Sequence, residues 1–360
     1  MRTFGVEEEL LLVDATTGRP RPLAPEILAQ AAGRELAGFA LESEMDQEML
    51  EVISPPCATA DELRSFVLAG REMADGLARE LDARAVALAT SPIRGRPHTS
   101  VSPRYNAVLE RFRGLAAATL ECGLHVHVSI ADAEEGVAIL DRIRAWLPIL
   151  LALSANSPFR DGADTGYASY RHVVWHQWPT AGPLELLHTP ARYEQLVQSL
   201  LATGGILDDG QLYFDARLSR HHPTVEIRVA DVCLDPEDTI TIAVLVRALV
   251  DTAAAAWRAG EPAPDIPTPS IRLASWMAAR WGVRGDLVDP GTGRAVPAAG
   301  AVEALLGHVR AALRANGDAK QAQTGARDIL VRGTGAERQR ARHELSGSLA
   351  GVVLGSDHEG

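Results

Sequence analysis

Two histidines, His125 and His127, stand two residues apart in an apolar run that predicts a buried β-strand. Side chains alternate between the two faces of a strand, so both imidazoles point to the same face. Two other apolar runs repeat this spacing with charged groups, as Glu7 with Glu9 and as Glu226 with Arg228. Charged groups on buried strands are costly unless they bind something. The pattern therefore predicts a ligand site on one face of a sheet.

Strands and helices are interleaved along the chain, whose 360 residues are 46 % hydrophobic and can build a large core. Strands are expected at 3–13, 39–44, 49–54, 84–89, 122–130, 211–217 and 224–230. Helices are expected at 25–36, 61–81, 103–120, 134–154, 190–203 and 236–257. Several strands follow one another too closely for regular parallel crossovers, so we expect an α+β core with a mainly antiparallel sheet.

The chain is expected to divide into three parts. Residues 1–258 form the core that carries the site, and the proline-rich segment 259–270 connects it to a helical C-terminal region, 271–346, packed on the core. Residues 347–360 are expected to form a flexible tail. Within the core, the segment 156–183 is rich in glycine and aromatic residues and lacks periodicity, which is typical of a binding loop or lid.

Composition and charge exclude several classes of partner. The net charge of −12 argues against nucleic acid. The run 146–155 is too short to span a membrane and contains Pro148, so no membrane partner is expected. Three consecutive glutamates before residue ten argue against a signal peptide, and three widely separated cysteines indicate a reducing compartment. We expect a cytoplasmic protein; a homodimer is compatible with the sequence.

Lysine is almost absent, since only Lys320 among the 35 basic residues is lysine. Its surroundings match neither a Walker phosphate loop nor a Schiff-base site. Any phosphate bound by this chain would have to be neutralised by arginine and metal.

Further carboxylates lie near the first strand pair in sequence. Glu51 is flanked by apolar residues and Glu44 stands across a short connection from it, whereas Glu42, Asp46 and Glu48 are expected to be solvated. Oxygen ligands with a single imidazole suit Mg²⁺ or Mn²⁺ better than Zn²⁺. Arginines beside such ions stabilise a transferring phosphoryl group. The residues thus indicate ATP-dependent phosphoryl chemistry without a P-loop.

Taken together, the motifs resemble the bacterial carboxylate–amine ligases called glutamate–cysteine ligase type 2, which are relatives of the glutamine synthetase superfamily. The matching segments are 4–9, Glu44 with Glu51, 122–128, 164–171, 215–217, 223–232, 287–290 and 333–339. The resemblance implies a glutamine-synthetase-like catalytic fold, with a curved, mainly antiparallel sheet as the floor of the site. It also implies ATP, Mg²⁺ (or Mn²⁺) and small amino-acid substrates.

The resemblance further implies roles for individual residues. Glu9, Glu44 and Glu51 would hold one ion, and Glu7, His125 and Glu226 would hold another nearer the ATP phosphates. Arg228 would contact the transferring phosphoryl group, with Arg217 and Arg171 as further phosphate or carboxylate contacts. His127 would line the substrate site, and the loop 156–183 would supply specificity and cover the reaction.

The implied reaction joins a carboxylate to an amine through an acyl phosphate, by default L-glutamate to L-cysteine. Three alternatives remain open from the sequence. The first two are a phosphotransferase to a guanidino group and a non-catalytic amino-acid or nucleotide sensor. The third is a zinc amidohydrolase built on the His-x-His pair, although His172, His176 and His188 fall outside convincing strands.

Overall fold

The computed structural model describes residues 1–34 and 38–355. Its centre is a seven-stranded sheet in the order β2-β3-β1-β5-β9-β8, with β4 also paired to β1. These strands are β1 (Phe4–Asp14), β2 (Ala40–Ser43), β3 (Met49–Ile53), β4 (Ala83–Val86), β5 (Gly123–Ser129), β8 (Ala216–Leu218) and β9 (Thr224–Asp231). Neighbouring strands run antiparallel in this sheet. The predicted α+β class is confirmed.

The two faces of the sheet differ because side chains alternate along each strand. In β5, Leu124, Val126 and Val128 belong to the main hydrophobic core, and His125 and His127 take the positions between them. The same alternation in β9 sends Val225, Ile227 and Val229 into that core. The opposite face therefore receives the polar groups of both strands.

Glu8 of β1 lies on the core face of the sheet, where its buried carboxylate requires hydrogen-bonding partners. It is 1 % exposed, and its carboxylate accepts hydrogen bonds from Arg71 Nε at 2.8 Å and from the Thr239 hydroxyl at 2.6 Å. Arg71 lies on α2 (Ala60–Arg79) and Thr239 on α8 (Pro236–Arg258). An ion pair and a hydroxyl thus compensate its burial, whereas Glu7 and Glu9 lie on the other face.

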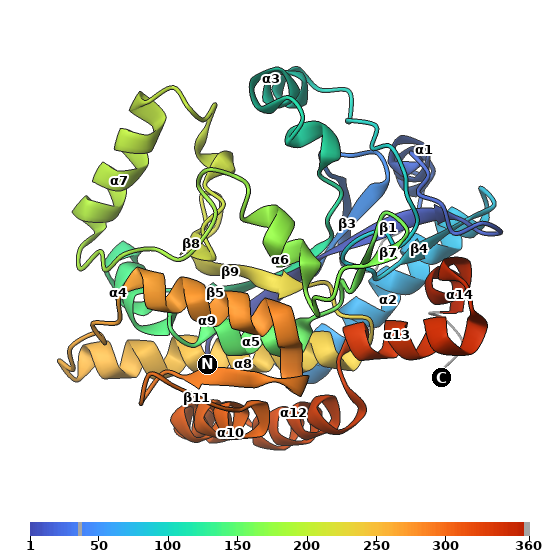
Figure 1. Cartoon of the computed structure of the whole chain (residues 1–360). Helices are drawn as coiled ribbons and strands as arrows, with labels where there is room; N and C mark the ends of the chain where they lie inside the picture. Colours follow the sequence, from blue (N-terminus) through green and yellow to red (C-terminus); the bar gives the residue numbers. More distant parts are fainter. Residues whose placement is uncertain (35–37, 356–360) are drawn as a thin grey trace.

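Helices cover the core face in layers. In Figure 1, α8 runs beneath the sheet, with α4 (Ala133–Ile143) and α5 (Leu147–Ser154) nearby and α10 (Ala298–His308) and α12 (Ala319–Arg332) in a further layer. On the opposite side, α3 (Pro103–Phe112) and α7 (Pro190–Ala202) stand apart from each other above the sheet. The polar face of the sheet looks into the space between them.

Helix α8 is the core helix of the protein. Asp235 caps its N-terminus by accepting a hydrogen bond from the Glu237 amide, and Pro236 occupies the first turn. By length and composition this helix could cross a membrane, but 78 % of its most apolar window is buried inside the protein. Burial within the fold accounts for its apolar character.

The C-terminal region shares the core of the sheet. Leu305, Leu313 and Ile329 belong to the same hydrophobic cluster as the strands β5 and β9. Its helices are α9 (Thr268–Trp281), α10, α11 (Arg310–Asn316), α12 and α13 (Gly335–Ser346). A hairpin of β10 (Asp286–Asp289) and β11 (Arg294–Pro297), which the sequence analysis did not predict, joins α9 to α10.

Two expectations about helices were wrong. The single helix at 134–154 is two helices, α4 and α5, because the chain turns between them and Pro148 can stand only in the first turn of the second. The expected flexible tail contains α14 (Leu349–Leu354), capped by Ser348, with Val352 and Val353 buried. Residues 356–360 of that tail lie outside the described part of the chain. Residues 35 and 36 of the helix expected at 25–36 also lie outside it, and the structure has α1 (Ala24–Ala31) in that region.

Candidate active site

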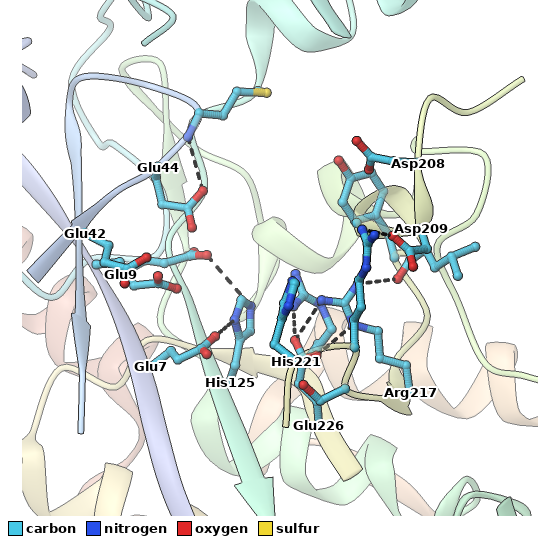
Figure 2. A pocket seen from close by; sticks show the side chains of 18 of the residues that line it. Glu7, Glu9, Glu42, Glu44, His125, Asp208, Asp209, Arg217, His221 and Glu226 are labelled. Carbon is cyan, nitrogen blue, oxygen red and sulfur yellow. Dashed lines mark hydrogen bonds and ion pairs between the residues drawn. The ribbon is translucent and has the colours of Figure 1, made fainter. Parts of the chain in front are cut away.

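A cavity of about 900 Å³ opens on the polar face of the sheet. Figure 2 shows carboxylates from β1 and the β2–β3 connection on one side of it, and Arg217 and Glu226 on the other. Nine of the ten residues predicted as site residues line its wall: Glu7, Glu9, Glu44, Glu51, His125, His127, Arg217, Glu226 and Arg228. The sheet brings together residues more than 200 positions apart in sequence.

Strand register explains this convergence. Glu7 of β1 stands opposite His125 of β5, and Glu9 stands opposite Glu51 of β3. On the other side of β5, His127 stands opposite Glu226 of β9. Because all six side chains point to the same face, the register alone places them around one space.

Three glutamates form a first group suited to a cation. Ligand oxygens of Glu9, Glu44 and Glu51 all lie within 4.8 Å of one another. Burial and the neighbouring Glu9 carboxylate raise the pKa of Glu44 to about 8, and burial followed by Glu44 raises the pKa of Glu51 well above its usual value. Carboxylates crowded in this way repel one another until a positive charge lies between them. This set is the one that the resemblance implied for one metal ion.

A second group lies on the β5–β9 side. Here Glu7 and Glu226 come within 4.8 Å of His127, while His125 forms a separate group with Glu7 and Glu51. The resemblance had implied His125 as the partner of Glu7 and Glu226. In the structure, Nδ1 of His125 lies 3.1 Å from Glu7, and Nε2 of His127 lies 3.1 Å from the same carboxylate. Both imidazoles therefore adjoin Glu7.

The two histidines and Glu7 influence one another electrostatically. Burial raises the pKa of Glu7, but hydrogen bonds from His125 and His127 outweigh it and hold that pKa below its usual value. Burial, helped by Arg228, lowers the pKa of His125. An ionised carboxylate beside a neutral imidazole is the donor set that a hard divalent cation accepts. The residues present thus fit one or two such ions.

Arginines on the other wall hold Glu226. Nε of Arg217 lies 2.7 Å from its carboxylate, and Arg228 also forms an ion pair with it. Burial raises the pKa of Glu226, but these two cations outweigh that effect and keep the group ionised. Arg228 lines the cavity and is 8 % exposed, and within the described residues its Nε has no hydrogen-bond partner, so its guanidinium keeps donor capacity to spare.

Arg171 is the predicted site residue that the structure places elsewhere. It does not line the cavity; it is 2 % exposed and donates to the Ala230 carbonyl at 3.0 Å. Its guanidinium occupies the space above Gly123, where any Cβ would collide with it. The structure thus gives Arg171 a buried packing position against Gly123, at the start of β5.

The loop 156–183 is ordered around one buried acid. Asp231 accepts hydrogen bonds from the Asn156 amide at 2.8 Å, the Ser157 hydroxyl at 2.7 Å and the Ser169 hydroxyl at 2.9 Å. The segment contains the short hairpin β6 (Phe159–Arg160) and β7 (Ala163–Asp164) and the helix α6 (Tyr170–Trp175). From this frame Trp175 and Trp178 extend into the cavity wall.

Several cavity residues were missed from the sequence. Asp46 and Glu48, expected to be solvated, are 1 % and 0 % exposed, and Asp46 lines the cavity. Their spacing of two and four residues from Glu44 was the available signal. Glu121 also lines the wall, four residues before His125. At the rim, Arg104 of α3 forms an ion pair with Asp208 at 2.7 Å, which links the two sides of the opening.

Comparison with known proteins identifies the family. The model of glutamate–cysteine ligase family 2 matches residues 3–354. A protein of Paenarthrobacter aurescens provisionally named glutamate–cysteine ligase 2-1 is 51 % identical over 98 % of this chain and 93 % of its own length. A protein of Streptomyces coelicolor provisionally named glutamate–cysteine ligase 2 is 46 % identical over 98 % of this chain and 97 % of its own.

Solved structures show the same fold at low sequence identity. The glutamate–cysteine ligase of Francisella tularensis, in complex with AMP, has a TM-score of 0.64 at 12 % identity and covers 99 % of this chain and 87 % of its own. A bifunctional glutathione synthetase from Pasteurella multocida has a TM-score of 0.65 at 15 % identity, over 99 % of this chain and 50 % of its own. Family membership removes the zinc amidohydrolase alternative. The chain belongs to glutamate–cysteine ligase family 2 and is an ATP-dependent ligase.

Proposed function

We propose that this ligase joins an amino-acid carboxylate to an amine through an acyl phosphate, with L-glutamate and L-cysteine as the default pair. The observation that carries the proposal is the meeting of metal-type carboxylates with Arg217 and Arg228 in one cavity. Phosphoryl transfer to a carboxylate brings several negative charges together, and cations must neutralise them. The names of the relatives support the choice of substrates.

The donor sets support binding of two divalent cations of the Mg²⁺ type. Glu9, Glu44 and Glu51 would hold one, and Glu7 with Glu226 would hold the other together with an imidazole from β5. When bound, such ions neutralise charge on the ATP phosphates and on the substrate carboxylate. Magnesium commonly binds through a few carboxylates plus substrate phosphates, which agrees with this open arrangement.

The chemistry has two steps. A carboxylate oxygen of the donor attacks the γ-phosphorus of ATP, the bond to the bridging oxygen breaks, and ADP leaves. The amine then attacks the acyl carbon, phosphate leaves with the bonding electrons, and the nitrogen loses a proton to give the amide. Arg228 would act in the first step, because it lines the cavity and its positive charge would stabilise the transferring phosphoryl group.

Water would hydrolyse the acyl phosphate, so the intermediate needs shelter. Trp175 and Trp178, which the loop 156–183 places on the wall, would exclude water from that part of the cavity. The ion pair between Arg104 and Asp208 would help to hold the two sides of the opening together. We propose that this loop covers the reaction.

The test is a matrix of carboxylates and amines with ATP and Mg²⁺, followed by phosphate release and by the mass of the product. The proposal predicts phosphate release that depends on both substrates and an amide of matching mass. A stable phosphorylated acceptor without released phosphate would indicate the guanidino-type phosphotransferase. ATP binding without turnover for any pair would indicate a sensor. In either case the ligation chemistry proposed here would be wrong.

A further inference from the structure

Two buried carboxylates on the cavity wall have no role in the chemistry above. Asp46 is 1 % exposed, and neither of its carboxylate oxygens has a hydrogen-bond partner among residues 1–34 and 38–355. Glu121 is 3 % exposed, and its oxygens also lack hydrogen bonds, although Arg160 Nη1 lies 3.2 Å from one of them. Both residues line the same cavity as the metal-type glutamates. We call this pair the acidic recess.

The backbone around Asp46 is fixed by contacts that do not involve its side chain. The Gln47 amide donates to the His98 carbonyl at 2.8 Å, and the Ser100 amide donates to the Met45 carbonyl at 2.8 Å. The segment therefore keeps its shape without help from the Asp46 carboxylate. A buried, unpartnered carboxylate held rigidly in a cavity wall is typical of a binding group rather than a structural one.

The charges around Asp46 favour a cationic ligand. The charged groups that act on it in the described structure are the carboxylates of Glu48, Glu121 and Glu44. Glu48 has its own partner, because His98 Nδ1 lies 2.6 Å from it, and Arg160 lies beside Glu121. Asp46 is thus the acid of this region left without a cation. A desolvated carboxylate of this kind is strongly destabilising until a positive donor binds it.

The ligand groups suited to a metal ion lie elsewhere in the cavity. Asp46 and Glu121 belong to none of the ligand groups in which Glu9, Glu44 and Glu51 or the histidines take part. An ammonium group carries three N–H donors and one positive charge, which matches two carboxylates that accept hydrogen bonds and lack them. Asp46 and Glu121 line the same cavity as Glu44, so a small amino acid bound to them would lie in the cavity that holds the metal-type glutamates.

We propose that Asp46 and Glu121 bind the ammonium group of an amino-acid substrate. This inference rests on the proposed function, because it assigns a subsite within the same cavity. The ammonium group belongs either to the carboxylate donor or to the amine acceptor, and the chemistry of recognition is the same for both. The recess would select amino acids over otherwise identical acids and thiols that lack the amino group.

Calorimetric titration with paired probes tests this subsite. The probes are L-glutamate with glutarate, and L-cysteine with 3-mercaptopropionate, each added to protein holding Mg²⁺ and a non-hydrolysable ATP analogue. Wild type should bind at least one amino acid more than about tenfold tighter than its partner without the amino group. Asp46→Asn and Glu121→Gln should lose that preference. Glu194→Gln, which removes the same charge from an exposed position on the rim, should keep it.

The outcomes separate this inference from the proposed function. A preference for glutamate assigns the recess to the donor, and a preference for cysteine assigns it to the acceptor. Equal or absent binding of the paired probes by wild type overturns the subsite, as does an unchanged preference in Asp46→Asn. A lower Mg²⁺ stoichiometry in Asp46→Asn would instead make the recess a metal site. An amino preference without amine-dependent phosphate release keeps the subsite and rejects the ligation chemistry.

Discussion

Asp46→Asn should stabilise the ligand-free protein at neutral pH and leave its stability nearly unchanged in acid. Burial, followed by the charge of Glu48, raises the pKa of Asp46 from 3.8 to about 8. A carboxyl whose pKa is raised on folding destabilises the folded state only where it would be ionised in the unfolded chain. The destabilisation is therefore absent below about pH 4, grows as the pH rises towards 8, and is constant above that.

The magnitude follows from the shift in pKa. Each pKa unit corresponds to about 1.4 kcal/mol. At pH 7 the raised pKa of Asp46 therefore lowers the free energy of unfolding of the wild type by about 4 kcal/mol, and the asparagine variant does not carry this cost. Urea unfolding in EDTA at pH 5 and pH 7.5 should show the advantage of the variant growing by about 3 kcal/mol between the two conditions. Glu194→Gln, which removes a carboxylate from an exposed position, serves as the control. An equal difference at both pH values would refute the reasoning.

Three further outcomes are expected. Glu9→Gln and Glu226→Gln should each abolish ATP consumption with unchanged circular dichroism; normal turnover in both would contradict the two-ion arrangement. Arg228→Ala should lower kcat by about 100-fold with a smaller change in the KM for ATP; a loss confined to KM would reject its role in phosphoryl transfer. Mg²⁺ should raise the melting temperature more at pH 8 than at pH 6. The reason is that the pKa of Glu44 is raised to about 8, so protons compete with the ion for this carboxylate at the lower pH. An equal rise at both pH values would argue against the ligand group of Glu9, Glu44 and Glu51.

The polar face of the sheet was predictable because alternation along a strand is a local property. His125, Glu7 and Glu226 could each be placed on a face from neighbouring residues alone, and the register then brought them together. Sequence patterns could not show how deeply a side chain is buried or whether it reaches the cavity. Arg171 was expected to contact phosphate or carboxylate, yet it is buried against Gly123, which leaves room for its guanidinium, and does not line the cavity.

Burial of the acidic recess could not be predicted for a similar reason. Asp46 and Glu48 were expected to be solvated because they lie between two strands. Instead, the segment 98–100, about fifty residues later, packs over them, forms backbone hydrogen bonds with the residues around Asp46, and places His98 beside Glu48. The division of 134–154 into two helices depended on a turn whose buried Arg144 donates to carbonyls at Leu184 and Ile266. Such contacts arise only after the chain has folded.

Transfer of oxygen from substrate to phosphate tests the acyl phosphate most directly. L-Glutamate labelled with ¹⁸O in its γ-carboxylate is supplied with ATP, Mg²⁺ and L-cysteine, and the released phosphate is analysed by mass spectrometry. The account predicts that each phosphate carries one oxygen from the carboxylate, because that oxygen bridges carbon and phosphorus in the intermediate. Unlabelled phosphate, formed while the amide accumulates, would contradict it.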